Sequence, residues 1–134
     1  MQRKFRLTRS EDFKRVRRSG KSYAHPLVVL IAQAHDQRSS PVDQRSTLQS
    51  GSVDQPRVKV GVAAGRTVGT AVVRNRAKRL LREAMRPLIP NIASGFDLIL
   101  IARPGLVSAS LDDARRALLT LLQRAQILIP INES

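Results

Sequence analysis

The 134-residue sequence contains no cysteine and no tryptophan, and aromatic residues make up only 3% of it. Without cysteine, the chain can form no disulfide bond, no thiolate nucleophile and no sulfur-ligated metal site. With so few aromatic rings, stacking on bases cannot dominate a contact with nucleic acid. The absence of cysteine therefore removes several classes of enzyme and favours a protein of a reducing compartment.

Long hydrophobic runs are also absent. No apolar run reaches the roughly 18 residues that could span a bilayer. The basic N-terminus, MQRKFRLTRSEDF, is not followed by an apolar stretch, so we expect no secretory signal. We therefore expect a cytoplasmic protein.

Residues that carry catalysis are scarce. The two histidines are His25, which precedes a proline in a strand-like run, and His35, which opens a polar stretch, so we interpret both as structural or solvated. The acidic pairs Glu11–Asp12 and Asp112–Asp113 fall in the first turns of predicted helices, where negative charge suits the helix dipole. The GRTVG turn lacks the GK[ST] ending of a phosphate-binding loop. We predict no catalytic residue and no metal ligand.

Acidic residues are outnumbered by basic ones. The chain has 24 Lys and Arg against 10 Asp and Glu, a net charge of +14. Such a charge disfavours the compact state through self-repulsion and attracts polyanions. The expected partner is nucleic acid or an anionic membrane surface, and the length suits a single domain, residues 1–134, with a modest core.

The order of elements predicts an α+β fold in which helices pack on a small mixed sheet. Residues 35–56 lack periodicity and are rich in Ser, Gln, Asp and Pro, so we interpret them as a flexible loop between strands. The predicted elements are a helix over 8–20, a strand over 22–34 that Pro26 breaks or places on an edge, a strand over 57–64, a helix over 70–86, a strand over 96–102 and a helix from 110 to 128.

The helix over 70–86 is the most informative element. On a helical wheel, one arc of roughly 100° is apolar and holds Val73, Ala77, Leu80, Leu81, Ala84 and Leu88. The opposite face, which we name the cationic ridge, is interrupted only by Glu83 and consists of Arg74, Asn75, Arg76, Lys78, Arg79, Arg82 and Arg86.

The cationic ridge admits two interpretations. A solvated helix face is polar in any case, but it usually mixes charges of both signs. Here Arg74, Lys78 and Arg82 are like charges spaced i,i+4, which costs a few tenths of a kcal/mol for each pair. Arginine also grips phosphate with its planar fork. The ridge therefore favours nucleic-acid contact, and the basic segment up to Lys21, with the GRTVG turn, could join it in one electropositive cleft.

Four blocks of sequence resemble a known family. Arg74-Asn75-Arg76, followed by Lys78-Arg79 and Arg82, is similar to the RNR signature of the protein component of bacterial ribonuclease P. RLTRSEDFKRVRRSGKS resembles the opening helix of that family, and the strand before the signature resembles its central strand and turn. FDLILIARPG with the helix after it resembles the end of the family's domain, and only residues 35–56 stand outside.

The resemblance implies a two-layer α/β sandwich in the order helix, three strands, helix, strand, helix. It implies a ribonuclease P whose catalytic RNA, with Mg²⁺, removes the 5′ leader of precursor tRNA, while the protein binds that RNA and the leader. The implied partners are this RNA and precursor tRNA, with no membrane, no small-molecule substrate and no cofactor held by the protein. By position, the resemblance assigns RNA binding to Arg74, Asn75, Arg76, Lys78, Arg79, Arg82 and Arg66, and a leader-binding cleft between the first helix and the sheet to Phe13, Arg9, Lys14 and Arg17.

Two positions depart from the family pattern. Arg17 and Ile31 stand where the family often has aromatic residues. We therefore expect weaker stacking on leader bases and a larger share for phosphate attraction.

Two other functions share the same charge. A general basic nucleic-acid-binding protein, such as a ribosomal or DNA-binding module without a role in tRNA processing, would bind regardless of a 5′ leader. A membrane-surface protein would use the basic helix, but its apolar side is narrow and free of aromatic residues.

Overall fold

The computed structural model describes residues 6–7, 10–34, 58–93 and 95–128 of the chain. The predicted order of helices and strands is confirmed, and the predicted loop over 35–56 lies outside the described residues. The elements are α1 (Ser10–Ser19), β1 (Lys21–Ala24), β2 (Val28–Ala34), β3 (Val58–Ala64), α3 (Ala71–Met85), β4 (Phe96–Ala102) and α4 (Leu111–Ala125), with 3-10 turns η2 (Arg66–Val68), η3 (Arg86–Asn91) and η4 (Pro104–Ser108).

The four strands form one mixed sheet in the order β1-β2-β4-β3. β2 pairs antiparallel with both β1 and β4, whereas β3 and β4 are parallel and α3 connects them. Pro26 interrupts the strand predicted over 22–34, because proline has no N–H to give to a sheet ladder. The result is the β1–β2 hairpin, whose turn is closed by a hydrogen bond from His25 N to Val28 O of 3.0 Å.

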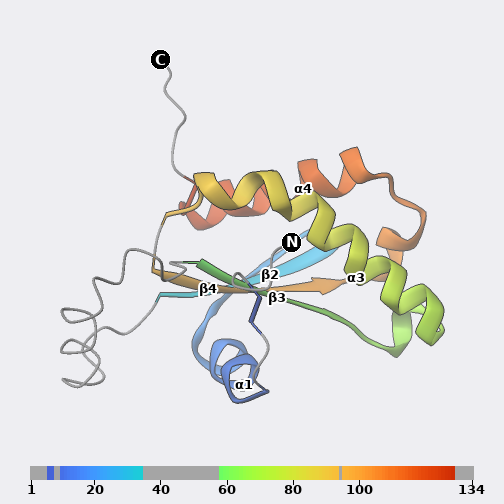
Figure 1. The fold of residues 1–134 in the computed structure, drawn as a ribbon, viewed down its shortest axis with the longest axis horizontal. Helices are drawn as coiled ribbons and strands as arrows, with labels where there is room; N and C mark the ends of the chain where they lie inside the picture. The colour runs from blue at the N-terminus through green and yellow to red at the C-terminus, as the bar shows by residue number, and fades with distance from the viewer. Residues whose placement is uncertain (1–5, 8–9, 35–57, 94, 129–134) are drawn as a thin grey trace.

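Helices cover both faces of the sheet. Successive side chains of a strand point to opposite faces, so the apolar runs of β2 and β4 supply two clusters. The larger cluster packs under α3 and α4 and includes Leu30, Leu98 and Leu100. The smaller cluster packs under α1 and consists of Leu7, Val16, Ile31 and Ile99. Figure 1 shows α1 on the side of the sheet opposite to α3 and α4, so α1 stands outside the predicted two-layer sandwich.

The helix ends follow their capping residues. Ser110 Oγ accepts from Asp113 N at 3.0 Å and Asp113 Oδ2 accepts from Ser110 N at 3.2 Å, which completes a capping box at the start of α4. The apolar face of α4 buries Ala114, Ala117, Leu118, Leu121 and Leu122, whereas Leu111, at the start of the helix, is 39% exposed. In α3, Thr70 caps the first turn and the helix ends at Met85, shortly before Pro87. None of the helices within the described ranges is long and apolar enough to cross a membrane.

Candidate nucleic-acid interface

The cationic ridge lies on α3 opposite the buried residues Ala77, Leu81, Ala84 and Met85. Arg74, Lys78 and Arg82 are half-buried along one row, and Asn75, Arg76 and Arg79 are exposed beside them. Within the part of the chain that the structure describes, these six side chains form no hydrogen bond or ion pair. Glu83, the acid that interrupts the ridge, lies 3.7 Å from the guanidinium of Arg86. The positive charge of the ridge is therefore available to an external anion.

The half-buried arginines are electrostatically unusual. Burial, together with the positive charge of Arg6, lowers the pKa of Arg82. The Nε atoms of Arg74 and Arg82 are shielded from solvent, and no acceptor among the described residues reaches them. Buried donors usually have a hydrogen-bond partner in folded proteins, so this arrangement is suited to an acceptor supplied from outside.

Two arginines of α4 have structural roles instead. On α4, Arg115 donates from Nε to Ala84 O at 3.3 Å and from Nη2 to Glu83 O at 3.4 Å, so it pairs with carbonyls in the last turn of α3. Arg124 donates to Ala24 O at 3.0 Å and ties α4 to β1. These two arginines hold elements together and are not part of the ridge.

The aromatic ring of Phe13 lies on the α1 side of the sheet against β3. Its partner is Gly61, where an added Cβ would meet the Cζ atom of Phe13 at 2.4 Å. Any larger residue at position 61 would displace the ring. Lys14 and Arg17 are exposed on α1, and Arg9, the fourth residue assigned to the leader cleft, lies outside the described residues.

A polar clamp fixes α1 on the sheet. Arg15 donates to Asp97 Oδ2 at 2.7 Å, to Asp12 Oδ1 at 3.3 Å and to Gln33 Oε1. Asp97 and Gln33 are cross-strand partners on β4 and β2, so one guanidinium bridges two strands. The hydrogen bond to Asp97 raises the pKa of Arg15. This clamp was not predicted from the sequence. Its signal there is a single Asp within an apolar strand, because a buried carboxylate requires a partner.

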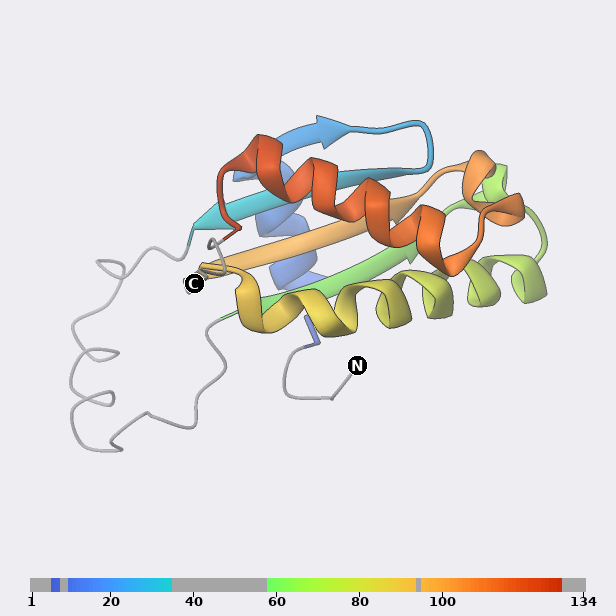
Figure 2. The same ribbon diagram turned by 90° about the horizontal axis from the view of Figure 1, so that it is seen from above.

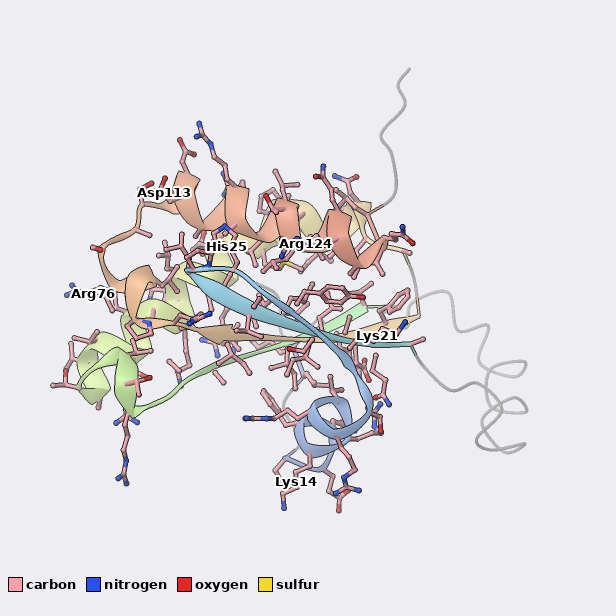
Figure 3. The ribbon with its side chains drawn as sticks, turned by 180° about the vertical axis from the view of Figure 1, so that it is seen from behind. Lys14, Lys21, His25, Arg76, Asp113 and Arg124 are labelled. Carbon is pink, nitrogen blue, oxygen red and sulfur yellow. The ribbon has the colours of Figure 1, made fainter. Side chains whose placement is uncertain are left out.

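The two basic helices do not enclose one cleft between them. α1 and α3 pack on opposite faces of the sheet, and Lys14 and Arg76 lie on these two sides in Figure 3. Arg66 is exposed in η2, immediately before α3, and so extends the ridge at the start of that helix. Ile31, at the position where the family resemblance noted a frequent aromatic residue, is 7% exposed and packs in the α1 cluster.

His25, Asp12 and Asp113, which belong to the histidines and acidic pairs noted in the sequence, have structural roles. His25 Nδ1 accepts from Leu27 N at 3.1 Å in the β1–β2 turn, and His35 lies outside the described residues. Asp12 pairs with Arg15, and Asp113 caps α4. Among the residues that the structure describes, no three His, Asp or Glu side chains are grouped as a metal site.

Comparison with known proteins agrees with this arrangement. The family model described as Ribonuclease P matches residues 1–126. The ribonuclease P protein component of Herpetosiphon aurantiacus is 38% identical over 128 residues, covering 95% of this chain and 89% of that protein. The corresponding protein of Chloroflexus aurantiacus is 35% identical over 137 residues, covering 100% and 87%.

Solved structures agree in fold. The RNase P protein of Thermotoga maritima superposes with a TM-score of 0.66 at 26% identity, covering 89% of this chain and 96% of that one. The RNase P protein of Staphylococcus aureus gives a TM-score of 0.70 at 22% identity, covering 92% and 97%. The chain therefore belongs to the family of ribonuclease P protein components.

Proposed function

We propose that this chain is the protein subunit of a ribonuclease P ribonucleoprotein. In this role it binds a catalytic RNA through α3 and the 5′ leader of precursor tRNA on the α1 side of the sheet. The observation that carries the proposal is the cationic ridge, whose Arg74, Lys78 and Arg82 have no acidic partner within the described residues. A general nucleic-acid-binding protein would share this charge, but it would not need the ordered blocks that place the chain in the family.

The ridge suits the backbone of a folded RNA. Positions four apart on a helix are about 6 Å apart along its axis, so Arg74, Lys78 and Arg82 present one cation per turn. Arginine binds phosphate through two parallel N–H groups, and each phosphate that is neutralised releases counterions. This contact would position the RNA without reading its sequence, as phosphate contacts generally do.

The α1 surface suits a single strand. Phe13 offers one ring beside Gly61, and Lys14 and Arg17 offer exposed charge. A surface with one aromatic and several cations would hold the leader chiefly by its phosphates. Mature tRNA has no leader, so such a contact would strengthen binding of the precursor over the product.

We assign the hydrolysis to the RNA, which would act with Mg²⁺ that it binds itself. The protein would contribute charge neutralisation and thereby reduce the concentration of Mg²⁺ that the RNA needs. In the described residues, the carboxylates with a defined role serve as an ion-pair partner or a helix cap, as Asp12 and Asp113 do. These roles support a protein that positions its partners and leaves the chemistry to them.

The test is cleavage of a precursor tRNA by bacterial ribonuclease P RNA at low Mg²⁺, with and without the protein. Release of the 5′ leader should be stimulated by the protein and absent when the protein is assayed alone. If folded protein binds RNA equally well with and without a leader and gives no stimulation, the chain is a general nucleic-acid-binding protein.

A further inference from the structure

The N-terminal segment brings one more arginine to the ridge. Leu7 N donates to Val60 O at 2.8 Å, and Arg6 forms a parallel bridge with Val60, so this segment extends the sheet beside β3 (Figure 2). Leu7 is 4% exposed and packs in the α1 cluster. Because successive residues of an extended chain point to opposite faces, the side chain of Arg6 points to the face that α3 covers.

Arg6 and Arg82 act on each other from different parts of the chain. Arg82 on α3 is half-buried, and the positive charge of Arg6 contributes to the lowering of its pKa. The Nε atoms of both guanidiniums are shielded from solvent without an acceptor in the described residues. The guanidiniums of Arg6 and Arg82 are therefore two like charges close to each other beside β3, each with an Nε donor that has no acceptor among the described residues.

The acidic side chains of the described part of the chain do not relieve this repulsion. Asp12 and Asp97 pair with Arg15, Glu83 pairs with Arg86, and Asp113 caps α4. The remaining acids, Glu11 and Asp112, belong to the first turns of α1 and α4 and form no ion pair with Arg6 or Arg82. No acceptor for the two Nε groups lies among the described residues, so the pair is suited to an acceptor that another molecule supplies.

We propose that Arg6 and Arg82 together form a site for one RNA phosphodiester. The phosphate oxygens accept from both guanidiniums, and the negative charge cancels the repulsion between them. Arg74, two turns earlier on the same row of α3 and with the same shielded Nε, holds a neighbouring phosphate. This site rests on the proposed function, because it assumes that α3 faces RNA, and it adds to the interface a residue outside the signature helix.

A double-mutant cycle tests the shared phosphate. The affinity of the full chain for ribonuclease P RNA is measured for the wild type, Arg6→Gln, Arg82→Gln and the double variant, with Arg116→Gln as a matched loss of one exposed charge on α4. Each single variant should bind about fivefold more weakly and the double variant about tenfold or less, well short of the roughly 25-fold expected for independent contacts. Arg116→Gln should bind like the wild type.

Thermal melting of the free protein separates a binding role from a structural one. Arg6→Gln should not lower the melting temperature, because its side chain makes no hydrogen bond within the described residues. A lowered melting temperature that accounts for the loss of affinity would overturn the site.

The result also separates this inference from the proposed function. If Arg6→Gln matches Arg116→Gln both in affinity for the catalytic RNA and in binding of leader-bearing precursor tRNA by the holoenzyme, while Arg82→Gln is weakened in either assay, the shared site is wrong and the RNA-facing ridge stands. If the losses of affinity in Arg6→Gln and Arg82→Gln are fully additive in the double variant, the two arginines do not share one phosphate. If neither Arg82→Gln nor Arg74→Gln weakens binding of the catalytic RNA or of leader-bearing precursor tRNA, the ridge itself is not the RNA contact.

Two binding measurements identify which RNA supplies the phosphate. A loss of affinity for the catalytic RNA alone assigns the phosphate to that RNA. A loss confined to binding of leader-bearing precursor tRNA by the holoenzyme, absent with mature tRNA, assigns it to the leader. Either pattern, with non-additivity, supports the site.

Discussion

The guanidinium of Arg15 lies 2.7 Å from Oδ2 of Asp97 and thereby joins α1 to the central strand β4. The Asp97 side chain is only 4% exposed, whereas that of Arg15 is 41% exposed. The apolar cluster under α1 is small, with four buried residues in the described chain. The ion pair therefore adds to the apolar contacts that hold α1, and with it Phe13, on the sheet.

Arg15→Gln is expected to destabilise the fold more than Asp97→Asn. Loss of the arginine leaves a buried carboxylate without this cation, which costs about 3 kcal/mol in buried pairs and less here because Arg15 is partly exposed. Asn at position 97 still accepts a hydrogen bond from Arg15, so about 1–2 kcal/mol is expected. Urea denaturation measures both. Arg17→Gln, an exposed neighbour, is the control and should change stability by less than about 0.5 kcal/mol.

The effect of Arg15 should not depend on pH in the neutral range. The folded state raises the pKa of Arg15, so its stabilisation is fully present below the pKa of the unfolded chain and is lost only as pH rises through the folded value. The difference in unfolding free energy between the wild type and Arg15→Gln should stay constant from about pH 6 to pH 9. A difference that changes steeply within this range would contradict the assignment to the arginine charge.

Arg74→Ala is expected to weaken RNA binding and to flatten its salt dependence. Each neutralised phosphate contributes about 0.7–0.9 to the slope of log affinity against log salt concentration. The variant should therefore lose up to that amount of slope, and Arg82→Ala should behave in the same direction. Arg116→Ala should retain the wild-type slope. Unchanged affinity and slope in both ridge variants would defeat the assignment of the ridge to RNA.

Gly61→Ala is expected to displace Phe13. The added Cβ would lie 2.4 Å from the ring, and such overpacking costs about 1–3 kcal/mol. Stability should fall, and so should the preference of the holoenzyme for precursor over mature tRNA, because the ring moves away from the proposed leader surface. Gly65→Ala is a matched control, since nothing lies within 4 Å of a Cβ there.

Adding Phe13→Leu to Gly61→Ala separates the contact from a general effect on β3. The smaller side chain should recover part of the lost stability, but not the preference for precursor tRNA. No recovery of stability would show that the glycine serves the strand and not the ring.

Arg82→Lys is expected to turn a pH-independent contact into a titrating one. Burial and the charge of Arg6 lower the pKa at this position, but arginine stays charged at neutral pH. The unperturbed pKa of a lysine is about 10.4, so burial and the charge of Arg6 should bring the pKa of a lysine at position 82 closer to neutrality. The charged form binds phosphate, so binding is present below the lysine pKa and is lost as pH rises through it.

Fluorescence anisotropy from about pH 7 to pH 9 measures this effect. The affinity of Arg82→Lys for ribonuclease P RNA should fall relative to the wild type as pH rises. Arg79→Lys, at an exposed position of the ridge, should follow the wild type over the same range. Parallel pH profiles for Arg82→Lys and the wild type would contradict a shielded site beside Arg6.

The sequence by itself determined the helices, the strands and the family. Periodicity and caps were sufficient for α3 and α4, because Thr70, Ser110 and Pro87 act on neighbouring residues and need no tertiary contact. The cationic ridge was equally readable, since a helix places i,i+4 residues on one face wherever it packs.

Only the tertiary structure decided which cations are available and where the two basic helices lie. Arg15, Arg115 and Arg124 resemble the ridge arginines in sequence, but each donates to a group that is distant along the chain. Arg6 makes no such bond within the described residues, and it comes close to Arg82 only because its backbone pairs with β3. The face of the sheet that α1 occupies also depends on long-range packing of Leu7 and Val16. Local patterns fix secondary structure, whereas the partner of a charge depends on the path of the whole chain.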